Sequence, residues 1–153
     1  MKINIAKLST LLLAGLIAQG ASLVAADCIN TTTLVAGGTS GAICSTAAFT
    51  SGANSTVNGA INATAAVTLG ATSKVNGLVK AGAGYTSGDS ASVTGNVTAG
   101  AAYTSGANSV VTGDVNAAGA ITLGANSRIM GSAHSGTGVI TYGAGATVGS
   151  VLP

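Results

Sequence analysis

Glutamate is absent from this sequence, and charged side chains of the other kinds are scarce. The 153 residues include 5 Lys and Arg, 3 Asp and 1 His. Acid–base and nucleophilic catalysis need paired carboxylates, or a histidine beside a nucleophile. Asp89 and Asp114 fall at different positions of the repeat described below, and His134 lies at an outward position of it. We therefore expect no enzyme activity, no metal site and no bound cofactor.

The chain also lacks the basic stripe that nucleic-acid-binding proteins present. Lys2 and Lys7 belong to the N-terminal segment, so residues 27–153 carry as many positive as negative side chains. Nucleic acid and anionic lipid are therefore not expected partners. A surface with almost no net charge favours self-association instead.

A repeat of about 18 residues occupies most of the chain, in the range of periods that is typical of solenoids. Its clearest copy is 68–85, with the sequence TLGATSKVNGLVKAGAGY, and further copies are 50–67, 86–103, 104–121 and 122–140. The 122–140 copy has one extra residue, and 141–153 is a partial copy. A period of this length without a helical pattern predicts a solenoid, in which no single coil is stable alone.

The even positions of the coil, numbered from its leading threonine, are apolar or small. Position 8 is Val or Ile in every copy, position 12 is Ile, Val or Ala, and the odd positions are mostly polar residues or glycine. A period of two predicts strands with one face inward. We therefore predict an all-β fold, a triangular single-stranded β-helix of about seven coils with three strands of about six residues in each. Since many inward side chains are small, cohesion should depend on backbone ladders and stacked like residues.

Residues 1–26 have the features of a secretory signal peptide. Lys2 and Lys7 give the positive start, LLLAGLIA the apolar middle, and Val24-Ala25-Ala26 a small-residue cleavage site before Asp27. A retained membrane anchor is the alternative, but the apolar run is short for a membrane span. We expect a secreted protein, extracellular or at the cell surface after export of the bacterial type, and no membrane association after cleavage. Its N-terminal coil is 27–49 and its regular solenoid is 50–153.

Cys28 and Cys44 are the only cysteines, and both lie in the first, irregular coil. In an exported protein such a pair predicts a disulfide. A metal or redox pair is the alternative, but the spacing is unsuitable and no histidine is near. The stretch 32–49 fits the repeat with Thr32 at position 1 and Ile43 at position 12, so the disulfide would pin a degenerate coil.

One threonine begins every regular coil, and it forms a candidate flat binding face. Positions 3 and 17 beside it are mostly Gly or Ala, which leaves the hydroxyl and methyl groups unobstructed. The predicted face consists of Thr50, Thr68, Thr86, Thr104, Thr122 and Thr141. Position 5 holds Asn, Thr or Ser in the complete coils, which predicts a corner ladder of side-chain hydrogen bonds.

The run AVTLGATSKVNGLVKAGAGYT resembles the solenoid coils of the ice-binding-like β-helix family, which carries comparable T-L-G-A-x-x-x-V-x-G runs. The resemblance covers roughly residues 50–150 and implies an exported right-handed β-helix with a flat face that orders water. That family packs a long α-helix against its solenoid, whereas 27–153 contain no helical pattern. The V-x-G-x-V spacing is also similar to that of bactofilins, which implies end-to-end polymerisation. LGATSK and LGANSR weakly resemble hexapeptide transferases, but VNGLVK places its glycine one residue late.

Two functions are consistent with these patterns. The first is a secreted structural protein that polymerises head to tail with further copies of itself into an extracellular fibre or biofilm-matrix filament. The second is binding of ice, or adhesion to another extended surface, through the threonine face. Cleavage after Ala26 would leave a five-residue head before Thr32 and a thirteen-residue tail from Thr141, which together have the length of one coil. The expected polymer junction consists of Asp27, Ile29, Val151, Leu152 and Pro153.

Overall fold

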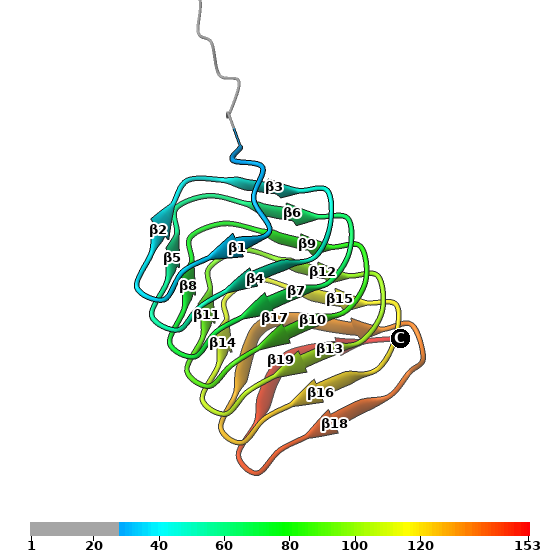
Figure 1. Cartoon of the computed structure of the whole chain (residues 1–153). Coiled ribbons are helices and arrows are strands. Elements are labelled where there is room, and N and C mark those ends of the chain that lie inside the picture. The colour runs from blue at the N-terminus through cyan, green and yellow to red at the C-terminus, as the bar shows by residue number, and fades with distance from the viewer. Residues whose placement is uncertain (1–27) are drawn as a thin grey trace, which may run out of the picture.

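The computed structural model describes residues 28–153, which form one solenoid of short parallel β-strands (Figure 1). Each complete coil runs along three faces, with a turn at every corner, so the cross-section is triangular (Figure 1). The predicted all-β solenoid is therefore confirmed. The strands of the inner coils have only two or three residues, instead of about six, because the corner turns take the remainder. The predicted signal peptide lies outside the described residues.

The first face, which we call the threonine face, is a seven-stranded parallel sheet with one strand from each coil. Its neighbours are hydrogen-bonded in register, so that Thr86 lies between Thr68 and Thr104. Its strands in spatial order are β1 (Thr33–Leu34), β4 (Phe49–Ser51), β7 (Val67–Leu69), β10 (Tyr85–Ser87), β13 (Tyr103–Ser105), β16 (Ile121–Leu123) and β18 (Ile140–Tyr142).

The second and third faces belong to one twelve-stranded sheet, because the long strand β17 (Arg128–Ser135) turns the corner between them. The second face contains β2 (Thr39–Ser40), β5 (Thr56–Val57), β8 (Lys74–Val75), β11 (Ser92–Val93), β14 (Val110–Val111) and the first part of β17. The third face contains β3 (Ile43–Ser45), β6 (Ile61–Ala63), β9 (Val79–Ala81), β12 (Val97–Ala99), β15 (Val115–Ala117) and the remainder of β17. The last strand, β19 (Thr147–Leu152), pairs with β17 along both faces.

The interior is formed by the even coil positions on the three faces, as the period of two predicts, whereas the even positions 4, 10 and 16 lie at corners and are half-buried or exposed. Val75, Val93 and Val115 are each at most 1% exposed. Buried serines also line the interior, and several are hydrogen-bonded across coils: Ser73 Oγ donates to Gly52 O at 3.0 Å and accepts from Ser55 Oγ at 3.2 Å. These bonds satisfy hydroxyl groups that would otherwise destabilise a dry core.

The corner after the threonine face has a left-handed backbone conformation in every coil. The φ angle at position 5 lies between 56° and 59° in five coils, and it is 70° at Gly37 and 71° at Gly145. The non-glycine residues with positive φ are Asn54, Thr72, Ser90, Asn108 and Asn126. One rung of the predicted hydrogen-bond ladder is present, because Thr72 Oγ1 donates to Asn54 Oδ1.

Two coils differ from the common length, and both differences lie at corners. Thr33 pairs with Thr50 and Ile43 with Ile61, so the separation along the chain is one residue shorter for the first pair than for the second. Position 1 of the first coil is therefore Thr33, and the predicted Thr32 is wrong, because this coil is one residue short between β2 and β3. The extra residue of the 122–140 copy lies in the turn between β17 and β18.

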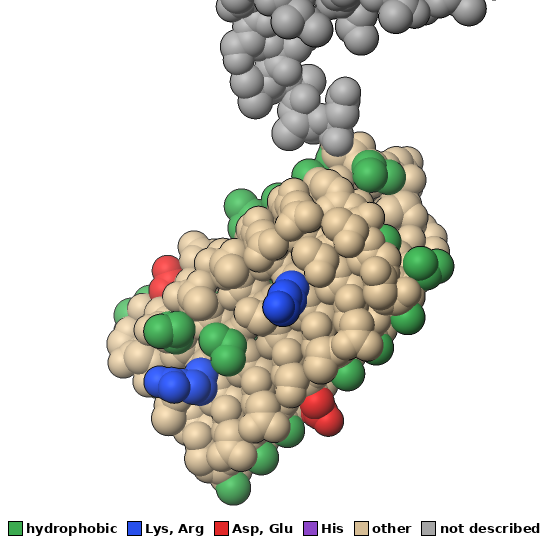
Figure 2. All heavy atoms as spheres, turned by 90° about the vertical axis from the view of Figure 1, so that its left-hand side faces the viewer, with side chains coloured by type: hydrophobic (Ala, Val, Ile, Leu, Met, Phe, Trp, Pro, Cys, Tyr) green, Lys and Arg blue, Asp and Glu red, His purple; other side chains and the backbone are tan. Residues whose placement is uncertain are grey.

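Charged side chains are sparse on the surface of the solenoid. Figure 2 shows the second face, where single Lys, Arg and acidic groups are separated by large uncharged areas. Lys74 and Arg128 both point outward from this face. The structure therefore presents neither a basic nor an acidic patch over the face seen in Figure 2.

Candidate functional site

The threonine face places all six predicted threonines in one ladder. Each is exposed, and each pairs with the threonine of an adjacent coil, as Thr50 with Thr68 and Thr122 with Thr141. Thr33 extends the ladder by one coil. The sequence reading missed Thr33 because the shorter first coil displaces it from the regular spacing.

Small residues border the threonine ladder on both sides. Position 3 is glycine in the regular coils, and an added Cβ there would meet the backbone of the preceding coil, at 2.5 Å for Gly70 and for Gly124. This close approach keeps the coils stacked and leaves the threonine side chains as the tallest groups along their ladder. Neighbouring strands repeat at about 4.8 Å, so the hydroxyl and methyl groups form a regular uncharged row.

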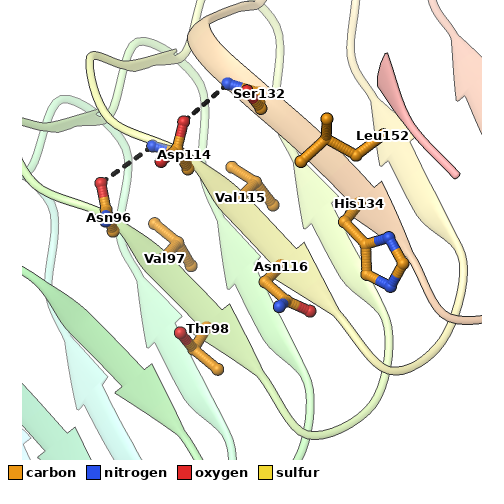
Figure 3. A pocket seen from close by; sticks show the side chains of 9 residues that line it. All are labelled: Asn96, Val97, Thr98, Asp114, Val115, Asn116, Ser132, His134 and Leu152. Carbon is orange, nitrogen blue, oxygen red and sulfur yellow. Dashed lines mark hydrogen bonds between the residues drawn. The ribbon is translucent and has the colours of Figure 1, made fainter. Parts of the chain in front are cut away.

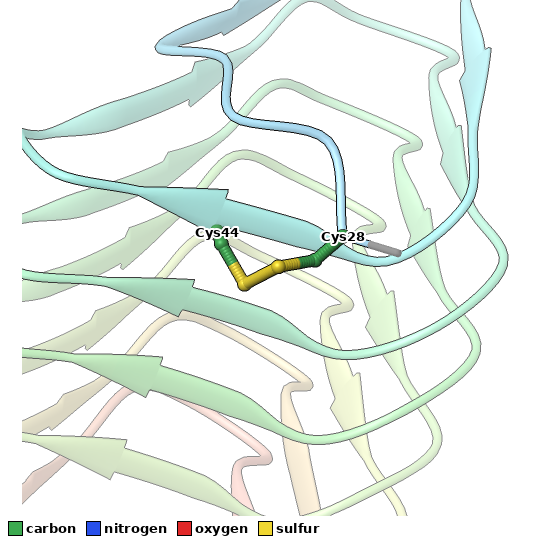
Figure 4. The surroundings of a disulfide bond; sticks show 2 residues. All are labelled: Cys28 and Cys44. Carbon is green, nitrogen blue, oxygen red and sulfur yellow. A yellow bond between two sulfur atoms is a disulfide. The ribbon is translucent and has the colours of Figure 1, made fainter. Parts of the chain in front are cut away.

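The N-terminal end, which we call the head, is pinned by the predicted disulfide. Cys28 and Cys44 are bonded, with their Cα atoms 5.4 Å apart (Figure 4). Ile29 forms an isolated parallel bridge with Ile43 of β3. The segment that contains Cys28 and Ile29 therefore lies over the outer edge of β3. Val35, in the first corner of the head, is 75% exposed.

The C-terminal end, which we call the tail, exposes positions that are core elsewhere. Val115 and Val151 both hold position 12, yet Val115 is 1% exposed and Val151 is 56% exposed. Tyr142 holds position 2, where Leu123 is buried in the preceding coil. Within residues 28–153 no strand pairs with the outer edges of β18 and β19. The tail is therefore an unfinished layer of the core.

The register of the two ends differs from the predicted shared coil. Val151 pairs with Ala133 at position 12 and Leu152 with His134 at position 13. Ile29 also holds position 12, because it bridges Ile43. Head and tail thus overlap at this position instead of completing one coil without surplus, so that part of the prediction is wrong. Asp27 lies outside the described residues, and the junction itself stays a prediction.

A shallow groove on the third face brings Asp114, Ser132 and His134 together, but it does not connect them as a catalytic relay (Figure 3). The carboxylate of Asp114 accepts a hydrogen bond from the backbone N of Ser132 at 2.7 Å. The hydroxyl of Ser132 is hydrogen-bonded to Ser150 Oγ at 2.8 Å. The imidazole of His134 points away from both groups (Figure 3). The side chains of Asp114 and Ser132 therefore link neighbouring coils.

Asp89 has a similar role, which the sequence reading did not predict. Its carboxylate accepts a hydrogen bond from Ala107 N of the next coil at 2.7 Å. Across the described part of the chain, no three side chains of His, Cys, Asp or Glu gather where they could hold a metal ion. The same residues, 28–153, include no helix with the length and apolar character of a membrane span.

The fold defines this chain as a β-solenoid protein with a threonine face, and no strand of residues 28–153 pairs with the outer edges of β1, β2, β18 and β19. Comparison with protein-family models, with curated proteins and with solved structures finds no match to it.

Proposed function

We propose that this protein is a structural subunit that polymerises head to tail into an extracellular fibre or matrix filament. The observation that supports this proposal is the location of its exposed large hydrophobic side chains. Among residues 28–153, and apart from Leu78 and Met130, they lie at or near the two ends: Ile29, Val35, Val139, Tyr142, Val151 and Leu152. Burial of these groups against a second copy removes apolar surface from water.

The backbone supports the same arrangement. β1 and β18 are the terminal strands of the threonine face, and each has one edge that no described strand covers. An open edge is a template for pairing with another chain. Pairing of β18 with β1 of the next copy would extend the parallel ladder in its existing direction. Such a contact joins two different surfaces and does not close, so it generates a filament.

The charge distribution is compatible with dense assembly. Lys74, Lys80 and Arg128 balance three aspartates in residues 27–153, so copies in a filament would not repel one another strongly. The signal peptide predicted over 1–26 and the disulfide of the head favour a location outside the cytosol.

Electron microscopy and sedimentation of the purified protein test this proposal. We expect unbranched fibres whose strands repeat at about 4.8 Å along the axis. Val151→Asp should prevent fibre formation, because it places a charge in the junction. Leu78→Asp is the matched control, since Leu78 is 51% exposed but lies on a side face. A protein that stays monomeric at high concentration, with its disulfide either closed or open, would overturn the proposal.

A second candidate function is binding of ice or another extended surface by the threonine face. The observation that favours it is the unbroken ladder from Thr33 to Thr141, which Gly or Ala borders on both sides in the inner coils, with Val35 and Val139 beside it only at the two ends. Thr86→Tyr and Thr104→Tyr together would interrupt this flat row. If the face binds ice, the wild-type protein shapes ice crystals and the double variant does not. Absence of ice shaping by a folded wild-type protein would exclude ice as the ligand.

A further inference from the structure

Ile29 makes the backbone contacts of a preceding coil. Its N donates to Ala42 O at 2.8 Å, and Cys44 N donates to Ile29 O at 3.1 Å. The next rung of the ladder has the same pattern, since Ile43 N donates to Ala60 O at 2.8 Å. Ile29 therefore occupies the place that position 12 of a coil before the first would hold.

In a filament, Val151 of the neighbouring copy would pair with β3 at the position that Ile29 holds. Val151 holds position 12 of the last coil and pairs inward with Ala133. If the ladder continues into a second copy, Val151 bonds to Ala42 O and Cys44 N of that copy. These are the two backbone atoms that Ile29 already uses. Ile29 of one copy and Val151 of its neighbour thus compete for the same edge of β3.

The other two faces carry no such competitor. β1 and β2 are terminal strands of their ladders, and no described residue pairs with their outer edges. β18 and the first part of β19 can therefore approach them directly. Within the part of the chain that the structure describes, residues pair with the head only on its third face, where the disulfide between Cys28 and Cys44 holds Ile29 in place.

We propose that the outer edge of β3 is the docking site for β19 of a second copy, and that the Cys28–Cys44 disulfide closes this site until it is opened. This inference rests on the proposed function, and it names the strand that docks and the bond that controls docking. The exchange replaces one isolated bridge by a longer strand pairing through Ser150–Leu152. While the disulfide is closed, Ile29 competes from within the same chain, where its effective concentration is high.

A dithiol reductant opens the disulfide by thiol–disulfide exchange. Its thiolate attacks one cysteine sulfur and forms a mixed disulfide, while the other cysteine leaves as a thiolate. The second thiol of the reductant then displaces the first cysteine. The protein gains two thiols, and the dithiol becomes a disulfide, so that two electrons are transferred.

The first experiment compares assembly rates by light scattering. The Cys28→Ser/Cys44→Ser variant, and the wild-type protein with dithiothreitol, should assemble at least about tenfold faster than the oxidised wild-type protein. Ile29→Pro removes the N–H donor and retains both cysteines, so it should also accelerate assembly. Equal assembly rates for all these forms, each with an unchanged circular dichroism spectrum, would contradict the proposal that the disulfide closes the docking site.

The second experiment identifies the contact directly. In a filament, Leu152 lies over Cys44 of the next copy, as it lies over His134 in its own chain. Leu152→Cys in the Cys28→Ser background should therefore give a ladder of intermolecular disulfides after mild oxidation. Thr98→Cys in the same background is the control, because Thr98 holds the same coil position but lies between inner coils. Filaments without this ladder would refute the docking site and leave the proposed function intact, whereas a lack of filaments in every form would refute the proposed function.

Discussion

The phenol rings of Tyr85 and Tyr103 stack in the core, with centroids 5.0 Å apart and planes inclined by 8°. Both side chains hold position 18 of adjacent coils, and both are 1% exposed. Burial raises the pKa of each phenol above its ordinary value, and the neighbouring Tyr103 raises the pKa of Tyr85 further. Each phenol is therefore held neutral by the fold.

This pair predicts loss of stability in alkali. Since the folded pKa values are raised, the unfolded chain releases these protons first, at a pH of about 10. Below that pH both phenols stay protonated in the folded and in the unfolded chain, so they give the free energy of unfolding no pH dependence. Above it, stability should fall by about 1.4 kcal/mol per pH unit for each tyrosine. Thermal unfolding from pH 8 to 12 measures this slope. Tyr85→Phe/Tyr103→Phe should flatten the slope, because it removes both titrating phenols. Phe49 is buried at the same coil position, so phenylalanine fits there.

Gly70 tests how closely the coils approach at the corners. A Cβ at this position would lie 2.5 Å from the carbonyl carbon of Gly52. Gly70→Ala should therefore destabilise the protein by about 2 kcal/mol or more, because backbone must move. Gly41→Ala is the control, since a Cβ there meets nothing within 4 Å. A similar unfolding midpoint for both variants in guanidinium would contradict the close stacking.

Thr72 has a φ angle of 56°, which β-branched residues rarely adopt. Thr72→Asn should raise the free energy of unfolding by up to about 1 kcal/mol, since asparagine tolerates this conformation and stands at the same corner in other coils. Thr98→Asn is the comparison, because Thr98 lies in a strand where Asn116 holds the equivalent place. Calorimetry of both variants decides the point, and a loss of stability in Thr72→Asn alone would contradict it.

Val93 and Ser92 test the inward and outward alternation of β11. Val93 is 1% exposed, and Ser92 pairs with Lys74 on the outer side of the second face. Val93→Asp should cost more than about 3 kcal/mol, because it buries an unpaired charge. Ser92→Asp should change stability by about 0.5 kcal/mol or less, as surface substitutions usually do. Comparable losses in the two variants would mean that the register is wrong.

The sequence predicted the regular coils because one pattern repeats with the same inward and outward alternation. Position 8 is buried from Val57 to Val111, and the threonine ladder is continuous, as the period requires. The disulfide also followed from composition, since two cysteines in one irregular coil leave a single pairing.

The coil positions of residues at the two ends were harder to predict, because they depend on the lengths of turns and not on the pattern of the strands. One residue missing between β2 and β3 moves position 1 from Thr32 to Thr33. A register shift between Val148 and Ser150 brings Val151 to position 12. Each change reverses the alternation within its coil, but the fixed 18-residue spacing hid it, although Thr33-Leu34 repeats the Thr-Leu pair with which the coils at Thr68 and Thr122 begin. The contact between Ile29 and β3 joins segments that share no repeat, and only the three-dimensional structure places them together.

The corners absorb a missing residue in the first coil and an extra one after β17, and the strands on either side keep their register. This tolerance makes the number of coils independent of the chemistry of the ends. A duplicated copy of 86–103 would lengthen the molecule by one strand spacing, about 4.8 Å, and add one rung to each face. The number of repeat copies in the sequence therefore sets the length of the solenoid. The distance between successive junctions along a filament can change by whole coils without any change in the residues at the junctions.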